Sequence, residues 1–287
     1  MGHNKIVFLV TTGLLLISGV FFYTVHENAE EYQEGVSSEV EVEQTWELPD
    51  DLKEISGIAF LEPNLLACVQ DEKGVIFIYN LETSAIERQI KFSGSGDYEA
   101  IAVNGNTAYV QVADGLIFRI NDFMDKNASV DKFKTPFSSK NNIESLFFDP
   151  VSKSLLLIPK ERGLDSKEAN GIYAVDVQTM KMKNKPILEL DFKEEIFESL
   201  REREKDRLFY PSDLVRDPKS GNYLILEAEM PHLLILDKKG KPQTLHRLDP
   251  NIFPQPEGLA FDNAGNLYIS SEGNPATIQR VSFKKKK

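Results

Sequence analysis

Two sets of acidic residues hold a regular place in a repeat that runs through the chain, and their spacing is the strongest hint of chemistry. In the first set, Glu99, Glu144 and Glu257 each precede a short apolar stretch, and a serine takes this place in two further repeats. The second set ends the next apolar stretch of each repeat. It consists of Asp71 with Glu72, Asp114, Glu161, Glu229 and Glu272.

The spacing between the two sets predicts that they meet. The offset is 15 residues in three repeats (56 to 71, 99 to 114, 257 to 272) and 17 in the other two (144 to 161, 212 to 229). If the two apolar stretches are antiparallel neighbours, the start of one lies beside the end of the other at one edge of the sheet. Both sets should then gather at the same edge.

Carboxylates that converge repel one another and raise one another's pKa unless a cation offsets their charge. Lys160 and Arg162 supply part of that charge. A divalent cation that prefers oxygen ligands supplies more, and Ca²⁺ fits carboxylates, carbonyls and waters. We therefore predict a Ca²⁺-like site with three metal ligands and a surrounding group of ligand candidates. The predicted metal ligands are Glu99, Glu144 and Glu257, and the further candidates are Asp71, Glu72, Lys160, Glu161, Asp213, Glu229 and Glu272.

A second interpretation of these acids stays open at the level of sequence. They would then cap loops and accept backbone N–H bonds around a water-filled channel, without holding a metal. The second set on its own is the weaker signal, because acidic residues commonly follow strands in loops.

The repeat itself predicts an all-β fold. Its clearest copy is QPEGLAFDNAGNLYISSE, residues 255–272, in which two alternating apolar stretches flank a Gly/Asn-rich turn, as in a β-hairpin. Residues equivalent to Gly258 follow one another at intervals of 43, 45, 68 and 45. These residues are Gly57, Ala100, Ser145, Asp213 and Gly258. A strand repeat with a period in the forties is typical of propeller blades.

The intervals predict a single β-propeller of five blades over residues 40–287. Six blades are the alternative, if the surplus in the long interval folds as a blade. The last repeat stops after three strands, so residues 40–48 (VEVEQTWEL) should supply its fourth strand and close the ring. Since the first strand of each blade lines the central channel, both acidic sets should lie at one channel mouth.

The surplus in the long interval contains an amphipathic stretch, DFKEEIFESLREREKDR. Phe192, Ile196 and Leu200 are spaced by four residues with charges between them, which predicts a surface helix over residues 191–207. Two interpretations stay open: the helix packs against the side of the ring, or it forms a lid beside the channel.

The N-terminal region predicts a membrane anchor. From Ile6 to Val25 about 20 residues carry no charge, which is long enough to cross a bilayer as one helix. Lys5 precedes this run and favours an inside start, which would place the propeller on the extracytoplasmic (periplasmic) side of the inner or plasma membrane. We expect residues 1–26 to be this anchor, with a cleaved signal peptide as the alternative, and residues 27–39 to be an acidic stalk.

Several classes of function find no support. The net charge of −12 argues against nucleic acid as a partner. His232 and His246 belong to no nucleophile or zinc motif, and we expect both to be surface residues. Cys68 has no second cysteine to pair with, which indicates a small buried side chain.

The stretches EISGIAF, DYEAIAV, NIESLFF with PKE, and QPEGLAFDNAGNLYISSEGNP resemble the SdiA-regulated family of bacterial proteins. The resemblance covers roughly residues 54–283 and implies a propeller related to the NHL-repeat group, often with an export or anchor segment. Where the second repeat should carry a glutamate after its second stretch, this chain has Val112-Ala113-Asp114-Gly115.

Three hypotheses of function follow. The first is a membrane-anchored extracytoplasmic propeller that binds a Ca²⁺-like cation, and with it a small ligand or an extracytoplasmic protein, at the acidic mouth. The second is a metal-dependent hydrolase of a lactone or phosphoester, with a metal-bound water as nucleophile and a glutamate such as Glu99 as general base. The third is an interaction scaffold with an inert channel.

Overall fold

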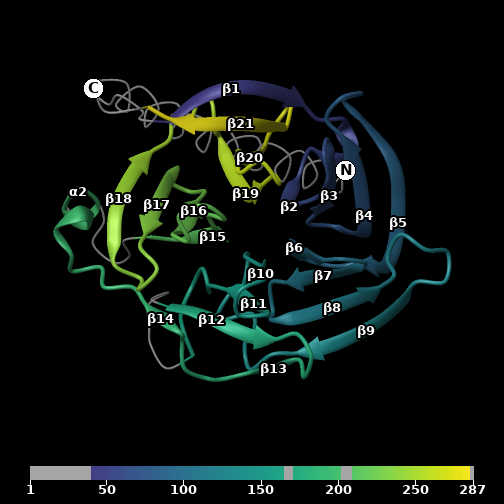
Figure 1. Ribbon diagram of the computed structural model, residues 1–287, viewed down its shortest axis with the longest axis horizontal. Helices are drawn as coiled ribbons and strands as arrows, with labels where there is room; N and C mark the ends of the chain where they lie inside the picture. The colour runs from purple at the N-terminus through teal and green to yellow at the C-terminus, as the bar shows by residue number, and fades with distance from the viewer. Residues whose placement is uncertain (1–39, 165–170, 202–208, 285–287) are drawn as a thin grey trace, which may run out of the picture. The chain divides into compact units, whose positions relative to one another are not determined.

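The computed structural model describes residues 40–164, 171–201 and 209–284 (Figure 1). The expected membrane segment from Ile6 to Val25 and the expected stalk lie outside these ranges. Within them, no helix has the length and apolar character needed to cross a membrane.

The described chain forms five antiparallel sheets arranged as the blades of a propeller, as the repeat predicted (Figure 1). Blade 1 consists of β2 (Ile55–Glu62), β3 (Leu65–Gln70), β4 (Lys73–Asn80) and β5 (Ala85–Ser95). Blade 2 consists of β6 (Tyr98–Asn104), β7 (Thr107–Val112), β8 (Leu116–Asn121) and β9 (Ser129–Lys134). Blade 3 consists of β10 (Phe147–Asp149), β11 (Ser154–Leu157), β12 (Gly171–Asp176), β13 (Lys181–Met182) and β14 (Leu188–Glu189). Blade 4 consists of β15 (Pro211–Arg216), β16 (Tyr223–Glu227), β17 (His232–Leu236) and β18 (Pro242–Arg247). Blade 5 consists of β19 (Gln255–Phe261), β20 (Leu267–Glu272), β21 (Thr277–Phe283) and β1 (Val40–Glu47).

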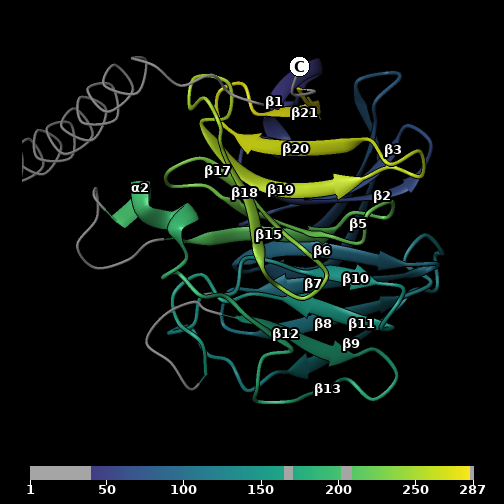
Figure 2. The ribbon, with the colours of Figure 1, turned by 60° about the vertical axis from the view of Figure 1, so that its left-hand side comes forward.

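The ring closes as predicted. Strand β1 pairs antiparallel with β21, from Val40 opposite Phe283 to Glu47 opposite Thr277, and the two strands lie side by side in both views (Figures 1 and 2). Trp46 extends the closure to blade 1, because its indole Nε1 donates to the carbonyl oxygen of Leu81 at 2.8 Å. One strand from the beginning of the domain thus joins the last blade to the first.

The hydrophobic core is divided among the five interfaces between neighbouring blades. The cluster between blades 5 and 1, for example, contains Trp46, Ile58, Phe77 and Tyr268. Cys68 belongs to the same cluster and is fully buried, in agreement with its predicted role. Because each blade packs both of its faces, the inner strands are apolar on both sides along much of their length, whereas outer strands such as β5 and β9 are mostly exposed.

Small residues let the innermost strands approach closely around the axis. A Cβ atom added to Gly57 would lie 2.9 Å from the Cα atom of Ala100 on the next inner strand. A Cβ atom added to Gly258 would lie 2.4 Å from Oγ of Ser270 and 3.2 Å from the Ile58 side chain of blade 1. We call the five equivalent positions the anchor ring: Gly57, Ala100, Ser145, Asp213 and Gly258.

The described part of the predicted helix is shorter than expected at its N-terminal side. It consists of a 3-10 turn, η2 (Glu195–Phe197), and α2 (Glu198–Arg201), and its expected end lies partly outside the described residues. It does not begin at Asp191, because the Asp191 carboxylate accepts the backbone N–H of Lys193 at 3.0 Å and holds a turn there. Phe192, Phe197 and Leu200 pack with apolar residues of blades 3 and 4, so this part covers the side of the ring.

Candidate functional site: an acidic channel mouth

Two carboxylates of the first set, those of Glu99 and Glu257, lie on β-bulges at the start of the inner strands. The ladder of each of four blades skips one residue there, and the skipped residues are Ser56, Glu99, Ser212 and Glu257. A bulge bends the strand and turns one side chain away from its regular direction. This explains why a charged residue can interrupt an otherwise buried strand.

Blade 3 reaches the same arrangement by a different route. Ile143 forms an isolated bridge with Pro159, and the Ser145 hydroxyl replaces the ladder by bonding both the N–H and the carbonyl of Ile158 at 2.9 Å. Glu144 stands between these two positions, as Glu257 stands between Pro256 and Gly258. The Asn142 side-chain amide donates to one Glu144 oxygen at 2.8 Å.

Lys160 is the centre of the acidic mouth. Its Nζ lies 2.8 Å from Oε2 of Glu144, with both side chains largely buried, and 3.9 Å from Oε1 of Glu229. Glu257 also acts on Lys160 electrostatically, and Glu99 and Glu272 act on Glu257. Five carboxyl groups from four blades therefore share one ammonium group, and the predicted metal ligands Glu99, Glu144 and Glu257 are among them.

The charges of this cluster shift one another's titration. Burial, followed by repulsion from Glu144 and Asp97, raises the pKa of Glu99 to about 9. Burial and the Asp71 and Glu54 carboxylates raise the pKa of Glu272 to about 7. Burial and Glu144 raise the pKa of Glu257 well above its usual range. Burial alone would lower the pKa of Lys160, but Glu144 and its neighbours raise it, so the lysine remains charged.

The second set follows a different register from the one that the sequence suggested. In blade 5 the ladder pairs Pro256 with Ser271, which makes Glu272 the residue at the channel edge. The same pairing in the other blades places the following residues at that level: Asp71, Ala113, Lys160 and Ala228. Asp114, Glu161 and Glu229 lie one residue further on, because the hairpins differ in length.

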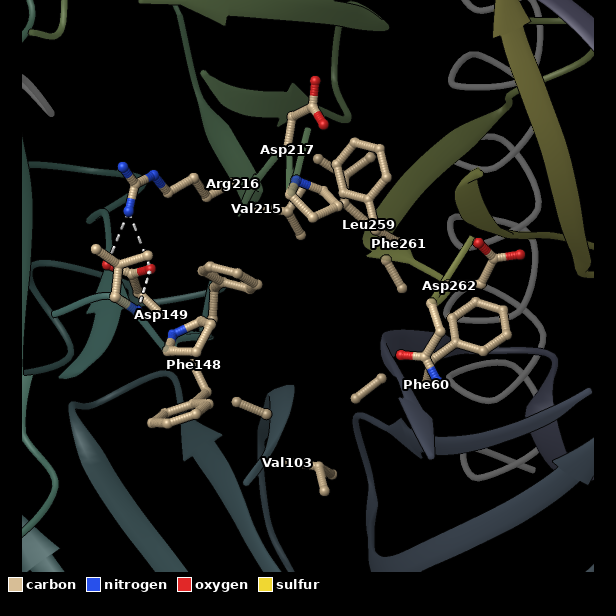
Figure 3. A pocket seen from close by; sticks show the side chains of 18 of the residues that line it. Phe60, Val103, Phe148, Asp149, Val215, Arg216, Asp217, Leu259, Phe261 and Asp262 are labelled. Carbon is tan, nitrogen blue, oxygen red and sulfur yellow. Dashed lines mark hydrogen bonds and ion pairs between the residues drawn. The ribbon is translucent and has the colours of Figure 1, made fainter. Parts of the chain in front are cut away.

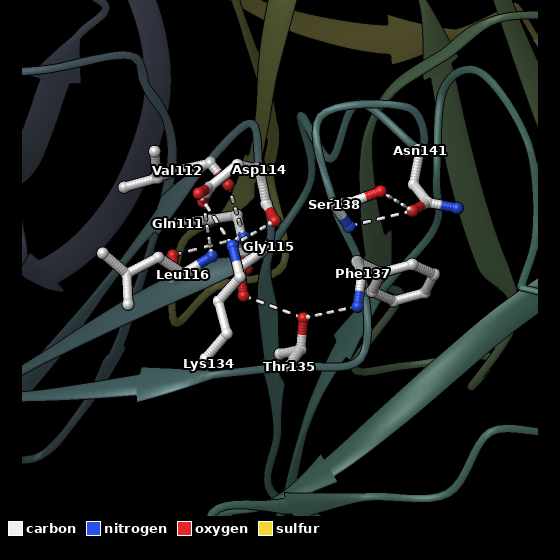
Figure 4. Close-up of polar contacts among 10 residues, drawn as sticks. All are labelled: Gln111, Val112, Asp114, Gly115, Leu116, Lys134, Thr135, Phe137, Ser138 and Asn141. Carbon is white, nitrogen blue, oxygen red and sulfur yellow. Dashed lines mark hydrogen bonds and ion pairs between the residues drawn. The ribbon is translucent and has the colours of Figure 1, made fainter.

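Asp114 shows what this one-residue difference does (Figure 4). Its carboxylate lies 2.7 Å from Nζ of Lys134 on the outer strand β9 and accepts the backbone N–H of Leu116 at 2.9 Å. Both contacts hold it in the hairpin turn. Blade 2 thus contributes Glu99 to the cluster, and its second-set carboxylate pairs with a lysine of its own blade instead.

The segment between blades 2 and 3 fixes the position of Glu144. The Asn141 side-chain oxygen accepts N–H and O–H bonds from Ser138 at 2.9 and 3.1 Å (Figure 4), and its amide donates to the Arg162 carbonyl at 3.0 Å. Backbone bonds from Lys160 to Asn142 and from Glu161 to Asn141 complete the connection. The loop that carries Glu144 is thereby tied to the loop that carries Lys160.

The remaining predicted candidates occupy varied positions. Glu229 is more than half exposed, Glu72 is exposed, and Glu161 is half-buried. Asp71 contributes to the mouth, since burial and then Glu54 and Glu72 raise its pKa. Sequence reasoning missed Glu54 and Asp97 as members of the cluster; both directly precede blades at the turn, where the repeat carries no constant residue.

Asp213 is at the anchor ring, inside the channel. It is almost fully buried, and its carboxylate accepts the backbone N–H of Leu214 at 2.8 Å and of Leu259 at 2.7 Å. The N–H of Leu146 is a further donor to it. Asp213 therefore joins the inner strands of blades 3, 4 and 5, which is the structural role that the second interpretation assigned to acids.

A buried pair that the sequence reasoning did not assign lies at the end of β16. The fully buried Glu227 accepts the backbone N–H of Tyr210 at 3.3 Å, and its Oε2 lies 3.5 Å from Nδ1 of His232. The sequence carries one signal for it: Glu227 directly follows the apolar run of Leu224, Ile225 and Leu226 in a strand that is buried along its whole length. His232 is thus buried beside a carboxylate, and His246 is buried as well, so the expectation that both are surface residues is wrong.

Stability should fall as the pH rises from about 4.5 to about 9. Because the folded pKa of Glu99 is raised from 4.5 to about 9, and those of Glu257 and Glu272 are raised too, the folded chain keeps protons that the unfolded chain has released. The free energy of unfolding then decreases by about 1.4 kcal/mol per pH unit for each such proton. Urea unfolding at a series of pH values measures this. Glu257→Gln should flatten the profile, whereas exposed Glu62→Gln should not; a parent profile that rises over this interval would contradict the assignment.

The cluster is not a preformed metal centre. Among the described residues, no three His, Cys, Asp or Glu side chains are placed as a ready ligand set. The chemistry of the side chains nevertheless fits a hard cation, which prefers carboxyl oxygens as ligands. The cluster has more carboxyl groups than the single Lys160 ammonium group can pair with, and that ammonium group is already bound to Glu144.

Comparison with known proteins decides the family. The sequence profile of the SdiA-regulated family matches residues 37–278. The chain belongs to the SdiA-regulated family. The resemblance noted in the repeat motifs is thereby confirmed. No curated protein matches the sequence.

Solved structures similar to this SdiA-regulated chain share its fold. Glutaminyl cyclase of Myxococcus xanthus has a TM-score of 0.61 at 10% identity, over 85% of this chain and 95% of the cyclase. A protein of unknown function from Bacteroides thetaiotaomicron VPI-5482 has a TM-score of 0.52 at 13% identity, over 80% of this chain and 58% of that one. A luciferin-regenerating enzyme has a TM-score of 0.50 at 15% identity, over 83% of this chain and 95% of the enzyme. At these identities the similarity concerns fold alone.

Proposed function

We propose that this member of the SdiA-regulated family is a binding propeller that takes a Ca²⁺-like divalent cation at the acidic mouth, together with a small ligand or an extracytoplasmic protein. The observation that carries the proposal is the cluster of Glu99, Glu144, Glu229, Glu257 and Glu272 around Lys160. In the absence of a cation this cluster reduces its charge by holding protons. A divalent cation would do the same by direct coordination.

The residues divide naturally between positioning and coordination. The bulges present Glu99 and Glu257 to the channel, and Asn142 orients Glu144. A bound cation would compete with Lys160 for Glu144, so the lysine would have to turn toward Glu229 and the exposed rim. Binding would also release protons from the carboxyl groups, so the affinity for Ca²⁺ should rise with pH.

The cellular setting belongs to the same proposal. The run from Ile6 to Val25 would hold the propeller at the extracytoplasmic face of the inner or plasma membrane. The acidic mouth would then meet a compartment in which millimolar-range Ca²⁺ sites of extracellular modules operate.

Calcium should stabilise the domain. If free Ca²⁺ is about 100 times the dissociation constant, the melting temperature should rise by about 5–10 °C, because a ligand that binds only the folded state adds about 2.7 kcal/mol. Differential scanning with Ca²⁺ and with chelator measures this rise. Glu257→Gln should weaken the response while leaving the chelated domain as stable or slightly more stable, since it relieves repulsion.

Exposed Glu62→Gln is the matched control and should keep the full response. A parent melting curve that is indifferent to Ca²⁺ between pH 6 and 8 would remove the metal site from this account. It would also remove the hydrolase hypothesis, which depends on the same metal. If Ca²⁺ does bind, the raised pKa of Glu272, about 7, favours a test for turnover with lactones and phosphoesters, because a group that titrates near neutrality suits acid–base work.

A further inference from the structure

The opposite mouth of the channel opens into a funnel that contains none of the acidic cluster. Its volume is about 530 Å³. It is lined by the far ends of the inner strands and by the turns that follow them (Figure 3). This volume is within the range of roughly 300–1,000 Å³ that is usual for small-molecule sites.

The floor of the funnel is separate from the acidic mouth. Ile58, Ile101, Leu146 and Leu259 line the funnel, and each directly follows a residue of the anchor ring. No anchor-ring residue is among the lining residues. Asp213 and the closely packed glycines of that ring therefore stand between the two ends of the channel.

Below its rim, at the level of the inner strands, the wall of the funnel is aromatic and apolar except on one side. Three residues beyond the anchor ring, each blade presents one side chain to the lining: Phe60, Val103, Phe148, Arg216 and Phe261 (Figure 3). The four apolar members are only half-buried. Arg216 of blade 4 is the single charged member of this level.

Blade 4 adds two lysines to this side. Lys219 comes from the β15–β16 turn and Lys238 from the β17–β18 turn, and both line the funnel. Glycines make room for them: a Cβ atom at Gly265 would lie 2.5 Å from Cε of Lys219, and one at Gly221 would lie 2.9 Å from Cε of Lys238. Within the described ranges neither lysine forms an ion pair, and the Lys219 ammonium group donates one hydrogen bond, to the carbonyl oxygen of Gly265 at 3.3 Å.

The aspartates at the rim are engaged by their own turns. Asp217 accepts the N–H of Lys219 and the hydroxyl of Ser220, and Asp262 accepts two N–H bonds from Ala264 and Asn266. Asp149 accepts N–H bonds from its turn and pairs with Arg216 at 3.3 Å. The groups left to meet a ligand are therefore phenylalanines on one side and two ammonium groups on blade 4.

We propose that this funnel is a second binding site, for a small molecule with an aromatic or branched apolar body and one anionic head group. The body would lie against Phe60, Phe148 and Phe261 over the apolar floor, and the head would face Lys219 and Lys238. This site lies at the other end of the channel from the proposed cation site and does not depend on it.

Two fluorescent probes of the same shape test the proposal. Anilinonaphthalene sulfonate carries an aromatic body with an anionic head, and phenylnaphthylamine has the same body without the head. The folded domain should bind both, the sulfonate more tightly. Lys238→Glu should weaken sulfonate binding by about ten-fold, the effect of losing one charge-assisted contact, and leave phenylnaphthylamine binding unchanged.

Matched variants complete the test. Lys239→Glu makes the same charge change on the neighbouring exposed residue, which does not line the funnel, and should change little. Val103→Trp should fill the funnel and reduce binding of both probes, with melting curves to confirm that it folds. Glu257→Gln should leave both probes unaffected, which separates this site from the cation site. Absence of probe binding to the parent, or equal losses with Lys238→Glu and Lys239→Glu, would overturn the proposal.

Discussion

Removal of residues 40–47 should convert the folded domain into an aggregating one. Without β1, the whole length of β21 from Thr277 to Phe283 becomes an unpaired edge, and exposed edges pair with other chains. The deletion also removes the buried side chains of Val40 and Trp46 and the bond from Trp46 to Leu81. We expect no cooperative melting transition in the deleted chain, and a chain that begins at Glu39 should melt as the full domain does.

Trp46→Ala provides a milder version of the same experiment. It keeps the strand but removes a large side chain from the core between blades 5 and 1, which should cost roughly 3–5 kcal/mol. Since Trp46 is the single tryptophan, the fluorescence of the parent reports directly on the closing strand. Sedimentation and light scattering measure the aggregation. A deleted chain that stays soluble and melts normally would show that closure by β1 is dispensable.

Asp213→Ala should be the most costly single substitution near the axis. The change leaves the N–H groups of Leu146, Leu214 and Leu259 without their acceptor in a buried place, which should lower the free energy of unfolding by roughly 3–5 kcal/mol. For a domain of this size the melting temperature should fall by about 10 °C. Urea unfolding monitored by circular dichroism measures the difference.

Two further substitutions identify the cause. Asp213→Gly gives blade 4 the residue that blades 1 and 5 have at this level, and it should not restore stability if the carboxylate matters more than the space. Asp213→Asn retains one acceptor oxygen and should fall between the parent and the alanine variant. Equal stability of the parent and Asp213→Ala would mean that the carboxylate does not tie blades 3, 4 and 5 together.

The repeat made most of the fold predictable. Alternating apolar residues, turn signals and anchor intervals specify five blades and a missing fourth strand, and residues 40–47 fill that place. The first acidic set was also predictable, because Glu99, Glu144 and Glu257 stand at the same point before the anchor. The structure adds the reason, which is a bulge in blades 2 and 5 and a serine-bonded substitute for it in blade 3.

The second acidic set was less predictable because it depends on hairpin length. Counting residues cannot decide whether Lys160 or Glu161, or whether Ala228 or Glu229, lies at the level of Glu272. A shift of one residue turns a side chain to the other face of the strand. Asp213 was predicted to belong to the acidic mouth because it is an acidic residue near the start of an inner strand. Its carboxylate instead accepts backbone N–H bonds from neighbouring inner strands, which gives it a structural role. The funnel had a signal at a constant offset of three residues from the anchor ring, but apolar residues at a strand position are expected to belong to the core.

The closing pair also has a consequence for how the domain is made. Val40 leaves the ribosome among the first residues of the domain, and its partner Phe283 is among the last. The other blades pair strands that are close in the chain, so they can form during synthesis, but the final sheet must wait for the whole chain. Until then, nascent chains expose the edges of β1 and β21, and two chains at high concentration can exchange β1 between them. A chaperone that shields these two strands would act at the step where the yield of folded protein is decided.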